Sequence, residues 1–297
     1  MSDAPPPDFL VDEALAARLV AAQHPDLVAP LRLVANGWDN ALFRLGDRYA
    51  VRMPRREAAV ALIRNEQRWL PELAPRLPVA VPAPVRTGRP APELGYDVPW
   101  SIVPWFDGEN GLAFDPETRG AAVNSLAAFV AELSATPAPP DAPANAYRGV
   151  PLARRDEDVR ARLASGRVPD APALLRVWDR ALAAPEWTGP NVWLHGDLHP
   201  ANLLLAPSGS LKAVIDFGDI TAGDPATDLA TAWLTFDARS RRTFHAELES
   251  RRGVDLATWD RARGWALVIA TAVVEQAGTT GSFGRVAAYV LEQVQLD

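Results

Sequence analysis

The sequence contains no cysteine and only four histidines, which are scattered along the chain. The lack of cysteine excludes disulfide bonds, cysteine-ligated zinc and thiol nucleophiles, and four separated histidines do not make a histidine-rich metal cluster. Any chemistry that this chain performs must therefore rest on carboxylates, amides and nitrogen or oxygen bases.

Long hydrophobic runs are also missing. No stretch reaches the roughly 20 apolar residues that a transmembrane helix needs. The N-terminal segment MSDAPPPDFL lacks the basic and apolar regions of a signal peptide. We therefore expect a soluble, cytoplasmic protein that does not engage a membrane.

Positively charged residues are fewer than negatively charged ones. The chain has 30 Lys and Arg residues and 37 Asp and Glu residues, which gives a net charge of −7. A nucleic-acid-binding protein normally carries a basic face, so this balance argues against a nucleic-acid partner and modestly favours a cationic small molecule. The length of 297 residues, 48% of them hydrophobic, allows two lobes with a core in each. Proline is dense at 77–92 and 137–151, which predicts extended connections there.

Two short polar motifs lie between apolar runs that are typical of buried strands. The first is VWLHGDLHPANLLL at 192–205, and the second is VIDFG at 214–218. The spacing His195-x-Asp197-x4-Asn202 matches the catalytic loop of kinases, in which the Asp accepts the proton of a hydroxyl and the Asn binds a metal. Asp216, in the second motif, would be a second metal ligand. Carboxylate and amide oxygens suit Mg²⁺, which neutralises the charge that develops during phosphoryl transfer.

A purely structural reading of these motifs exists, because Asp and Asn are common in turns and His195–Asp197 could simply connect two strands. Each motif alone is a moderate signal. The two motifs in this order, each between strand-like apolar residues, favour a phosphoryl-transfer site.

On these residues the chain resembles the aminoglycoside phosphotransferase family, whose members are protein-kinase-like enzymes that phosphorylate small molecules. The resemblance runs from about Leu31 to the C-terminus, and Gly196 stands where protein kinases have an Arg. It implies an α+β, protein-kinase-like bilobal fold, with an N-terminal antiparallel sheet plus a helix and a mainly helical C-terminal lobe. The nucleotide-binding lobe would span 1–106, with a hinge at about 100–106, and the catalytic and acceptor-binding lobe would span 107–297.

The resemblance also implies roles for the motif residues. Asp197 would be the catalytic base, and His195 would shape the catalytic loop. Asn202 and Asp216 would bind Mg²⁺, and the phosphoryl donor would be ATP or GTP.

The nucleotide lobe should begin with three strands at 31–34, 41–45 and 49–53, joined by turns. The turn around Trp38 would cover the phosphates, although it has one glycine where the kinase loop has three, and a hairpin without a ligand is an equal alternative. Arg52 occupies the place of the phosphate-binding Lys and keeps its charge. Glu66 lies on the apolar stripe of the following helix and would pair with Arg52, unless it faces water at the edge of the stripe.

The segment Trp100–Phe106 reads as an edge strand followed by a turn, and by resemblance it is the hinge that binds adenine. Val103 would be the gatekeeper, while the carbonyl of Pro104 and the amide of Phe106 would face the base. Trp105 and Phe106 could equally belong to the core or to a lid.

The C-terminal lobe should be helical near 115–135, 173–183, 225–233, 240–252, 256–276 and 283–294. Four acidic residues could bind the amines of a cationic acceptor, although a structural role is the alternative for each: Asp219, Asp224, Asp228 and Glu275. Asp228 in particular could anchor the catalytic loop. His199 could contact the substrate or only pack in the loop.

The resemblance therefore implies an enzyme that transfers the γ-phosphate of ATP or GTP to a hydroxyl of a small molecule. An aminoglycoside or another antibiotic is the acceptor class after which the family is named, and such an acceptor would imply antibiotic resistance. A kinase of a sugar, a choline-like or homoserine-like compound or a fructosamine is an alternative. So is a pseudokinase that binds nucleotide without turnover. Protein partners stay open.

Overall fold

The computed structural model describes residues 6–296, so the first five residues of the N-terminal segment lie outside the described part. The chain divides into two compact units. Unit 1 comprises residues 1–76, 80–107 and 215–218, and unit 2 comprises 77–79, 108–214 and 219–297. The short DFG segment therefore groups with the N-terminal part of the chain.

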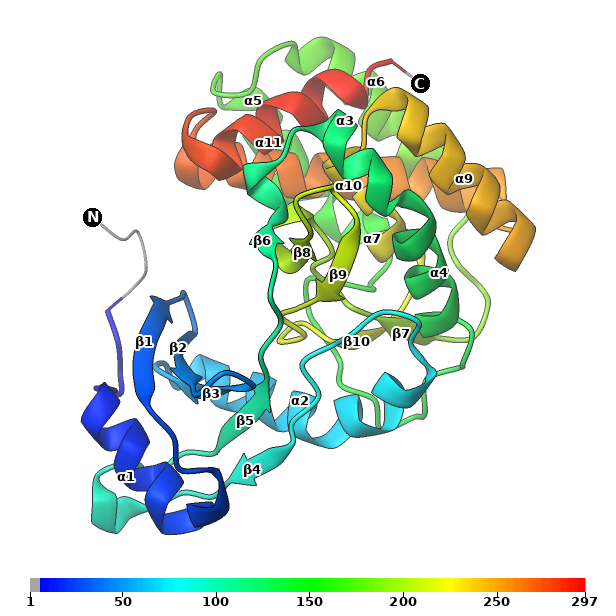
Figure 1. The fold of residues 1–297 in the computed structure, drawn as a ribbon. Coiled ribbons are helices and arrows are strands. Elements are labelled where there is room, and N and C mark those ends of the chain that lie inside the picture. Colours follow the sequence, from blue (N-terminus) through cyan, green and yellow to red (C-terminus); the bar gives the residue numbers. More distant parts are fainter. Residues whose placement is uncertain (1–5, 297) are drawn as a thin grey trace. The chain divides into compact units, whose positions relative to one another are not determined.

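Unit 1 is built on one antiparallel sheet (Figure 1). Its strands lie in the order β1 (Leu31–Asn36), β2 (Asn40–Leu45), β3 (Tyr49–Pro54), β5 (Trp100–Pro104) and β4 (Arg86–Gly88). The first three strands follow one another through tight turns, and β2 alternates between buried and half-buried side chains, as a strand with one covered face does. The three strands predicted at 31–34, 41–45 and 49–53 are confirmed.

Two helices accompany this sheet. Helix α1 (Glu13–Gln23) begins at Asp12, whose carboxylate accepts a hydrogen bond from the Leu15 amide at 2.7 Å, and it packs against β1. Helix α2 (Ala58–Leu73) packs against β3 and β5, and its buried face repeats at helical spacing. Leu19 of α1, Phe43 of β2 and Trp100 of β5 belong to one core.

The interpretation of Trp100–Phe106 as an edge strand is wrong. Strand β5 pairs with β3 on one side and with β4 on the other, so β4 is the edge. The three-residue strand β4 lies in the proline-dense stretch 77–92, where the sequence predicted only an extended connection. Because proline cannot donate in a ladder, this stretch carried no strand signal.

Unit 2 is mainly helical (Figure 1). Its described helices are α3 (Pro116–Arg119), α4 (Val123–Leu133), α5 (Asp156–Ala164), α6 (Ala171–Ala183), α7 (Ala226–Leu229), α8 (Thr231–Thr235), α9 (Ala238–Arg252), α10 (Leu256–Ala277) and α11 (Gly281–Gln293). Helix α10 packs against α5, α6, α7 and α11 and is the centre of this unit. Trp233 and Trp265 are buried in the core of this unit.

Two small antiparallel sheets complete unit 2. One pairs β7 (Val192–Leu194) with β10 (Thr221–Gly223), and the other has the order β6 (Glu109–Asn110), β8 (Leu203–Leu205) and β9 (Leu211–Val214). Strands β7 and β8 flank the polar motif at 195–202, so the apolar runs predicted as strands are confirmed.

The helices expected near 173–183, 240–252, 256–276 and 283–294 are confirmed by α6, α9, α10 and α11. A 3₁₀ turn splits the one expected at 115–135 into α3 and α4, and the one at 225–233 is split into α7 and α8. Helix α5 was not predicted. None of the helices within residues 6–296 has the combined length and apolarity that crossing a bilayer would require.

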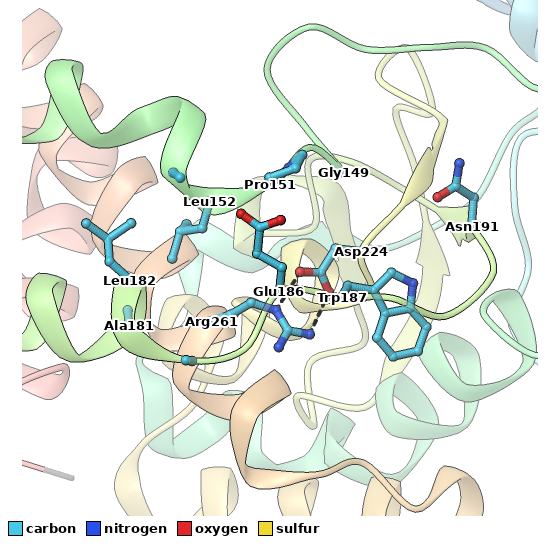
Figure 2. A pocket seen from close by; sticks show the side chains of 12 residues that line it. Gly149, Pro151, Leu152, Ala181, Leu182, Glu186, Trp187, Asn191, Asp224 and Arg261 are labelled. Atoms are coloured by element: carbon cyan, nitrogen blue, oxygen red, sulfur yellow. Dashed lines mark hydrogen bonds and ion pairs between the residues drawn. The ribbon is translucent and has the colours of Figure 1, made fainter.

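A buried ion pair ties α10 to the segment before α7 (Figure 2). Arg261 of α10 donates from Nε to Asp224 at 2.7 Å and from Nη2 to its other oxygen at 3.1 Å. The same guanidinium donates to the carbonyl of Pro185 at 2.6 Å and to the hydroxyl of Thr258 at 3.1 Å. Asp224 therefore serves the packing of unit 2.

Candidate active site

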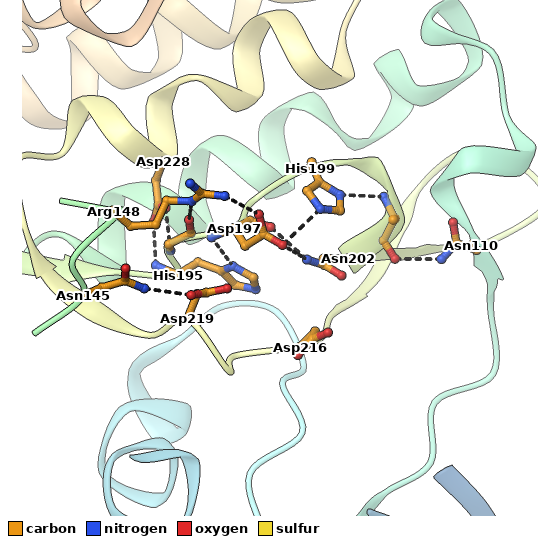
Figure 3. A network of polar contacts seen from close by, with 12 residues as sticks. Asn110, Asn145, Arg148, His195, Asp197, His199, Asn202, Asp216, Asp219 and Asp228 are labelled. Carbon is orange, nitrogen blue, oxygen red and sulfur yellow. Dashed lines mark hydrogen bonds and ion pairs between the residues drawn. The ribbon is translucent and has the colours of Figure 1, made fainter. Parts of the chain in front are cut away.

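One carboxylate holds the backbone of the loop between β7 and β8 (Figure 3). Asp228 of α7 accepts hydrogen bonds from the amides of His195, at 2.7 Å, and Gly196, at 2.9 Å. Burial raises the pKa of Asp228, and these two bonds oppose the rise. The suggestion that Asp228 anchors the catalytic loop is confirmed.

Gly196 is required by the backbone of this loop. Its φ is +86°, and a Cβ atom at this position would lie 2.2 Å from the carbonyl oxygen of Asp219. A larger residue, such as the Arg of protein kinases, therefore does not fit this loop.

Asp197 lies in a network that fixes both of its carboxylate oxygens (Figure 3). His199 Nε2 is 3.1 Å from Oδ2, and Asn202 Nδ2 donates to Oδ2 at 3.3 Å and to the Asp197 carbonyl at 2.8 Å. Arg148 donates from Nη2 to Oδ1 at 3.4 Å and from Nε to the Gly196 carbonyl at 2.8 Å. The carboxylate is thus oriented from two sides.

The surroundings of Asp197 favour its ionised form. Burial acts to raise its pKa, but the charge and hydrogen bond of His199 together with the charges of Arg148 and His195 outweigh burial. The pKa of Asp197 is therefore held below the usual range of a carboxyl group. His195 is fully buried, and its Nδ1 accepts a bond from the Asp197 amide at 3.2 Å, which suits the loop-shaping role predicted for it.

Asn202 and Asp216 have the donor chemistry of a magnesium site. Because Asn202 uses its Nδ2 atom on Asp197, its oxygen Oδ1 is the atom that can face a cation. Asp216 has a left-handed backbone, with φ of +62°, and its side chain is 57% exposed. No group of three or more His, Asp or Glu residues within 6–296 could hold a metal by itself.

Arg52 of β3 joins two carboxylates within unit 1. Its Nη1 atom donates to Glu66 at 2.6 Å, and its Nη2 atom donates to Asp216 at 2.8 Å. The pairing of Arg52 with Glu66 that the sequence predicted is therefore present, and the alternative that Glu66 faces water is wrong because it is buried. Burial raises the pKa of Glu66 to about 7, against the lowering effect of Arg52.

The remaining residues predicted to bind nucleotide also lie in unit 1. Trp38 is exposed in the turn between β1 and β2, and Val103 is buried in β5. The amide of Trp105 donates to the carbonyl of Arg48 at 2.8 Å. Since successive groups of an extended strand point to opposite sides, this bond turns the neighbouring Pro104 carbonyl and Phe106 amide away from β3. Their proposed contact with adenine stays a prediction.

The four acidic residues considered as amine ligands all have partners inside unit 2. Besides Asp224 and Asp228, the Asp219 carboxylate accepts a bond from Asn145 at 2.7 Å, and Glu275 accepts one from Arg162 at 2.8 Å. Each of the four carboxylates therefore has a structural contact, and a role in binding an amine stays a prediction.

A cavity of about 180 Å³ in unit 2 has Asp197 and His199 in its wall. Three arginines from the segment around α5 also line it, namely Arg148, Arg155 and Arg162. Sequence reasoning missed these arginines because it predicted no helix at 156–164. The acidic first turn of α5, Asp156–Asp158, is the helix-start signal that could have revealed it.

Comparisons with known proteins agree with this architecture. A family model described as phosphotransferase enzyme family matches residues 30–265. Among solved structures, the chain is similar to the GDP complex of aminoglycoside 2'-phosphotransferase-IIIa, with 18% identity, a TM-score of 0.69 and coverage of 96% of this chain and 99% of that chain. A comparison with curated proteins finds no match.

The chain is also similar to the macrolide 2'-phosphotransferase MphH from Brachybacterium faecium, with 23% identity, a TM-score of 0.61 and coverage of 93% of this chain and 97% of that chain. A third similar structure is the streptomycin–ATP–APH(2")-IIa ternary complex, with 17% identity, a TM-score of 0.59 and coverage of 88% and 90%. These likenesses confirm the α+β, kinase-like fold. Because the family model spans most of its length, the chain belongs to the phosphotransferase enzyme family and is a small-molecule phosphotransferase.

Proposed function

We propose that this enzyme transfers the γ-phosphoryl group of a nucleoside triphosphate to a hydroxyl group of a small molecule. The observation that carries the proposal is the fixed orientation of Asp197 in the loop between β7 and β8. Its carboxylate is held by His199, Asn202 and Arg148 and lies in the wall of a cavity.

In this mechanism Asp197 accepts a hydrogen bond from the acceptor hydroxyl and orients its oxygen toward the γ-phosphorus. A bond forms between that oxygen and phosphorus, the bond from phosphorus to the β,γ-bridging oxygen breaks, and the nucleoside diphosphate leaves. The hydroxyl proton passes to Asp197. Because the pKa of Asp197 is low, it is a weak base, so proton transfer comes late and orientation is its main contribution.

The donor side of the reaction would use the residues of unit 1. Arg52, kept in place by Glu66, would neutralise phosphate charge, and the segment from Val103 to Phe106 would hold the base through its backbone. The turn around Trp38 would cover the phosphates. Asn202 and Asp216 would hold Mg²⁺, which when bound supplies positive charge to the transferred group.

Two features of related structures support a nucleotide donor. Two similar structures are complexes with GDP and with ATP. Others are complexes with kanamycin and with gentamicin, so an aminoglycoside is one acceptor class to test, beside metabolites with a free hydroxyl. The pseudokinase alternative is disfavoured, because Asp197, Asn202 and Asp216 are all present in the chain.

The decisive experiment compares Asp197→Asn with the wild type in phosphoryl transfer and in nucleotide binding. Loss of the base should lower the rate by about 10²–10⁴, while the nucleotide dissociation constant changes only a few-fold. The control is Asp179→Asn, an exposed carboxylate of α6 that pairs with Arg160. An Asp197→Asn variant with wild-type turnover would refute the assigned role.

A further inference from the structure

The cavity beside Asp197 carries an unusual charge pattern. Arg148, Arg155 and Arg162 line it, and Asp197 is the one carboxylate among the described residues in its wall. The rest of the wall is mostly apolar and comes from α8, α10 and α11, for example Leu234, Val268, Ile269, Val273, Phe283 and Val286. The cavity therefore has a cationic side and an apolar side.

The carboxylates that pair with two of these arginines lie outside the cavity wall. Arg155 pairs with Asp158 at 2.6 Å, and Arg162 pairs with Glu275 at 2.8 Å. The two carboxylates are 47% and 43% exposed, whereas the arginine side chains are 11% and 14% exposed. Because these carboxylates are partly exposed, solvent screens the two pairs, and the guanidinium groups keep part of their attraction for an anion on the cavity side.

Both guanidinium groups also have unused hydrogen-bonding capacity. Nε of Arg155 and Nη1 of Arg162 are buried and have no hydrogen-bond partner within residues 6–296. Guanidinium groups can only donate, and their planar fork matches the oxygens of carboxylates and phosphates. Arg155 is further held over the ring of Tyr147, 5.3 Å from its centroid. The two arginines are thus oriented as well as charged.

A cationic acceptor does not suit this cavity. Its ammonium groups would face three guanidinium groups, and none of the four acidic residues considered as amine ligands lines the cavity. Asp224 is paired with Arg261. Asp228 is bonded to the backbone of the catalytic loop.

We propose that the acceptor is a small hydroxylated anion, whose carboxylate or phosphate group binds Arg155 and Arg162 while its hydroxyl lies at Asp197. This inference rests on the proposed function, because it names the acceptor class of the same site. The volume agrees with a small acceptor, since about 180 Å³ is less than the roughly 300–1,000 Å³ of pockets that enclose drug-sized ligands. The phosphoryl group passes to the acceptor hydroxyl, and the acid group does not react.

The test measures binding of matched probes by calorimetry. D-Gluconate, D-glucitol and D-glucamine share a polyhydroxy chain and end in a carboxylate, a hydroxymethyl group and an ammonium group, and D-glucitol 6-phosphate carries a phosphate. Each anion should bind about tenfold or more tightly than glucitol, and glucamine should bind more weakly. The two anions distinguish a carboxylate site from a phosphate site.

Variants of the two arginines test the assignment directly. Arg155→Gln and Arg162→Gln should each weaken anion binding about tenfold or more and leave glucitol binding unchanged. Arg160→Gln is the matched control, because Arg160 lies on the same helix but pairs with Asp156 and Asp179 outside the cavity wall. The unfolding temperature of each variant reports whether it folds.

The inference is overturned if glucamine or glucitol binds as tightly as the anions, if no anion binds, or if neither arginine variant changes anion affinity. Asp197-dependent phosphoryl transfer is measured separately, by mass spectrometry with the same probes and with aminoglycosides. Transfer to cationic acceptors alone would keep the proposed function and refute the anionic acceptor. Anion binding lost in both arginine variants, without transfer to any acceptor, would support the anion site and refute the proposed function.

Discussion

Asp224→Asn should destabilise unit 2, because it leaves Arg261 charged and buried without its counter-ion. The two side chains are 5% and 4% exposed and are joined by two hydrogen bonds, at 2.7 and 3.1 Å. Removing one partner of a buried pair costs about 3–5 kcal/mol. The lower end applies here, since Asn keeps the oxygen that accepts the Ala226 amide at 3.0 Å and can still accept one bond from Arg261.

For a unit of about 190 residues, a loss of about 3 kcal/mol in the free energy of unfolding corresponds to a fall in Tm of about 6–12 °C. Differential scanning calorimetry measures this fall. The matched control is Asp260→Asn, next to Arg261 on α10, which pairs with the exposed Arg180 at 3.0 Å. That pair should contribute at most about 1 kcal/mol.

A double-mutant cycle tests the physical reason. Because Arg261→Met removes the stranded charge, the double variant Asp224→Asn/Arg261→Met should lose about 2–3 kcal/mol less than the sum of the single variants. Additive losses would refute the ion-pair argument. An Asp224→Asn variant with unchanged Tm but weaker acceptor binding would instead return Asp224 to the role of a substrate ligand.

Two further predictions concern ionisation and the second buried pair. Since the native pKa of Asp197 is lowered, its contribution to stability is complete above the unfolded pKa near 3.9 and is lost as the pH falls through the native value. The Tm difference between wild type and Asp197→Asn should therefore be constant from about pH 7 to 5 and shrink below about pH 4. A difference that already shrinks near pH 6 would contradict the lowered pKa of Asp197. Glu66→Ala removes one of the two partners of Arg52 and should cost about 3 kcal/mol by chemical denaturation, whereas a loss under about 1 kcal/mol would show that Asp216 alone satisfies Arg52.

The part of the site that the sequence predicted is the part encoded by short spacing. His195, Asp197 and Asn202 lie within one loop, and the strands that flank them are marked by apolar runs. The contact between Arg52 and Glu66 was predictable for a similar reason, because a carboxylate on an apolar helix stripe needs a cation and β3 supplies one. Local pattern was sufficient in both cases.

The acceptor cavity could not be predicted in this way. Its arginines come from the end of a proline-dense stretch and from the segment that follows it, and α5 has almost no apolar stripe to mark it. They meet the catalytic loop only because α10 packs against both α5 and α11 in the folded unit, which is long-range information. The net charge of −7 describes the whole chain and carries no information on the cavity wall, which is locally cationic.

Arg52 stands where kinases have a Lys, and its contacts explain why an Arg is present. These contacts also bear on whether the enzyme is active. One fork of Arg52 reaches two carboxylates, with Nη1 on Glu66 and Nη2 on Asp216, whereas the ammonium of Lys is a single point of contact. Asp216 meets Arg52 through Oδ1 and is 57% exposed, so its second oxygen remains accessible to a cation. Arg52 therefore links Glu66 of α2 to Asp216 and leaves one oxygen of Asp216 for a metal. This departure from the kinase pattern is compatible with turnover.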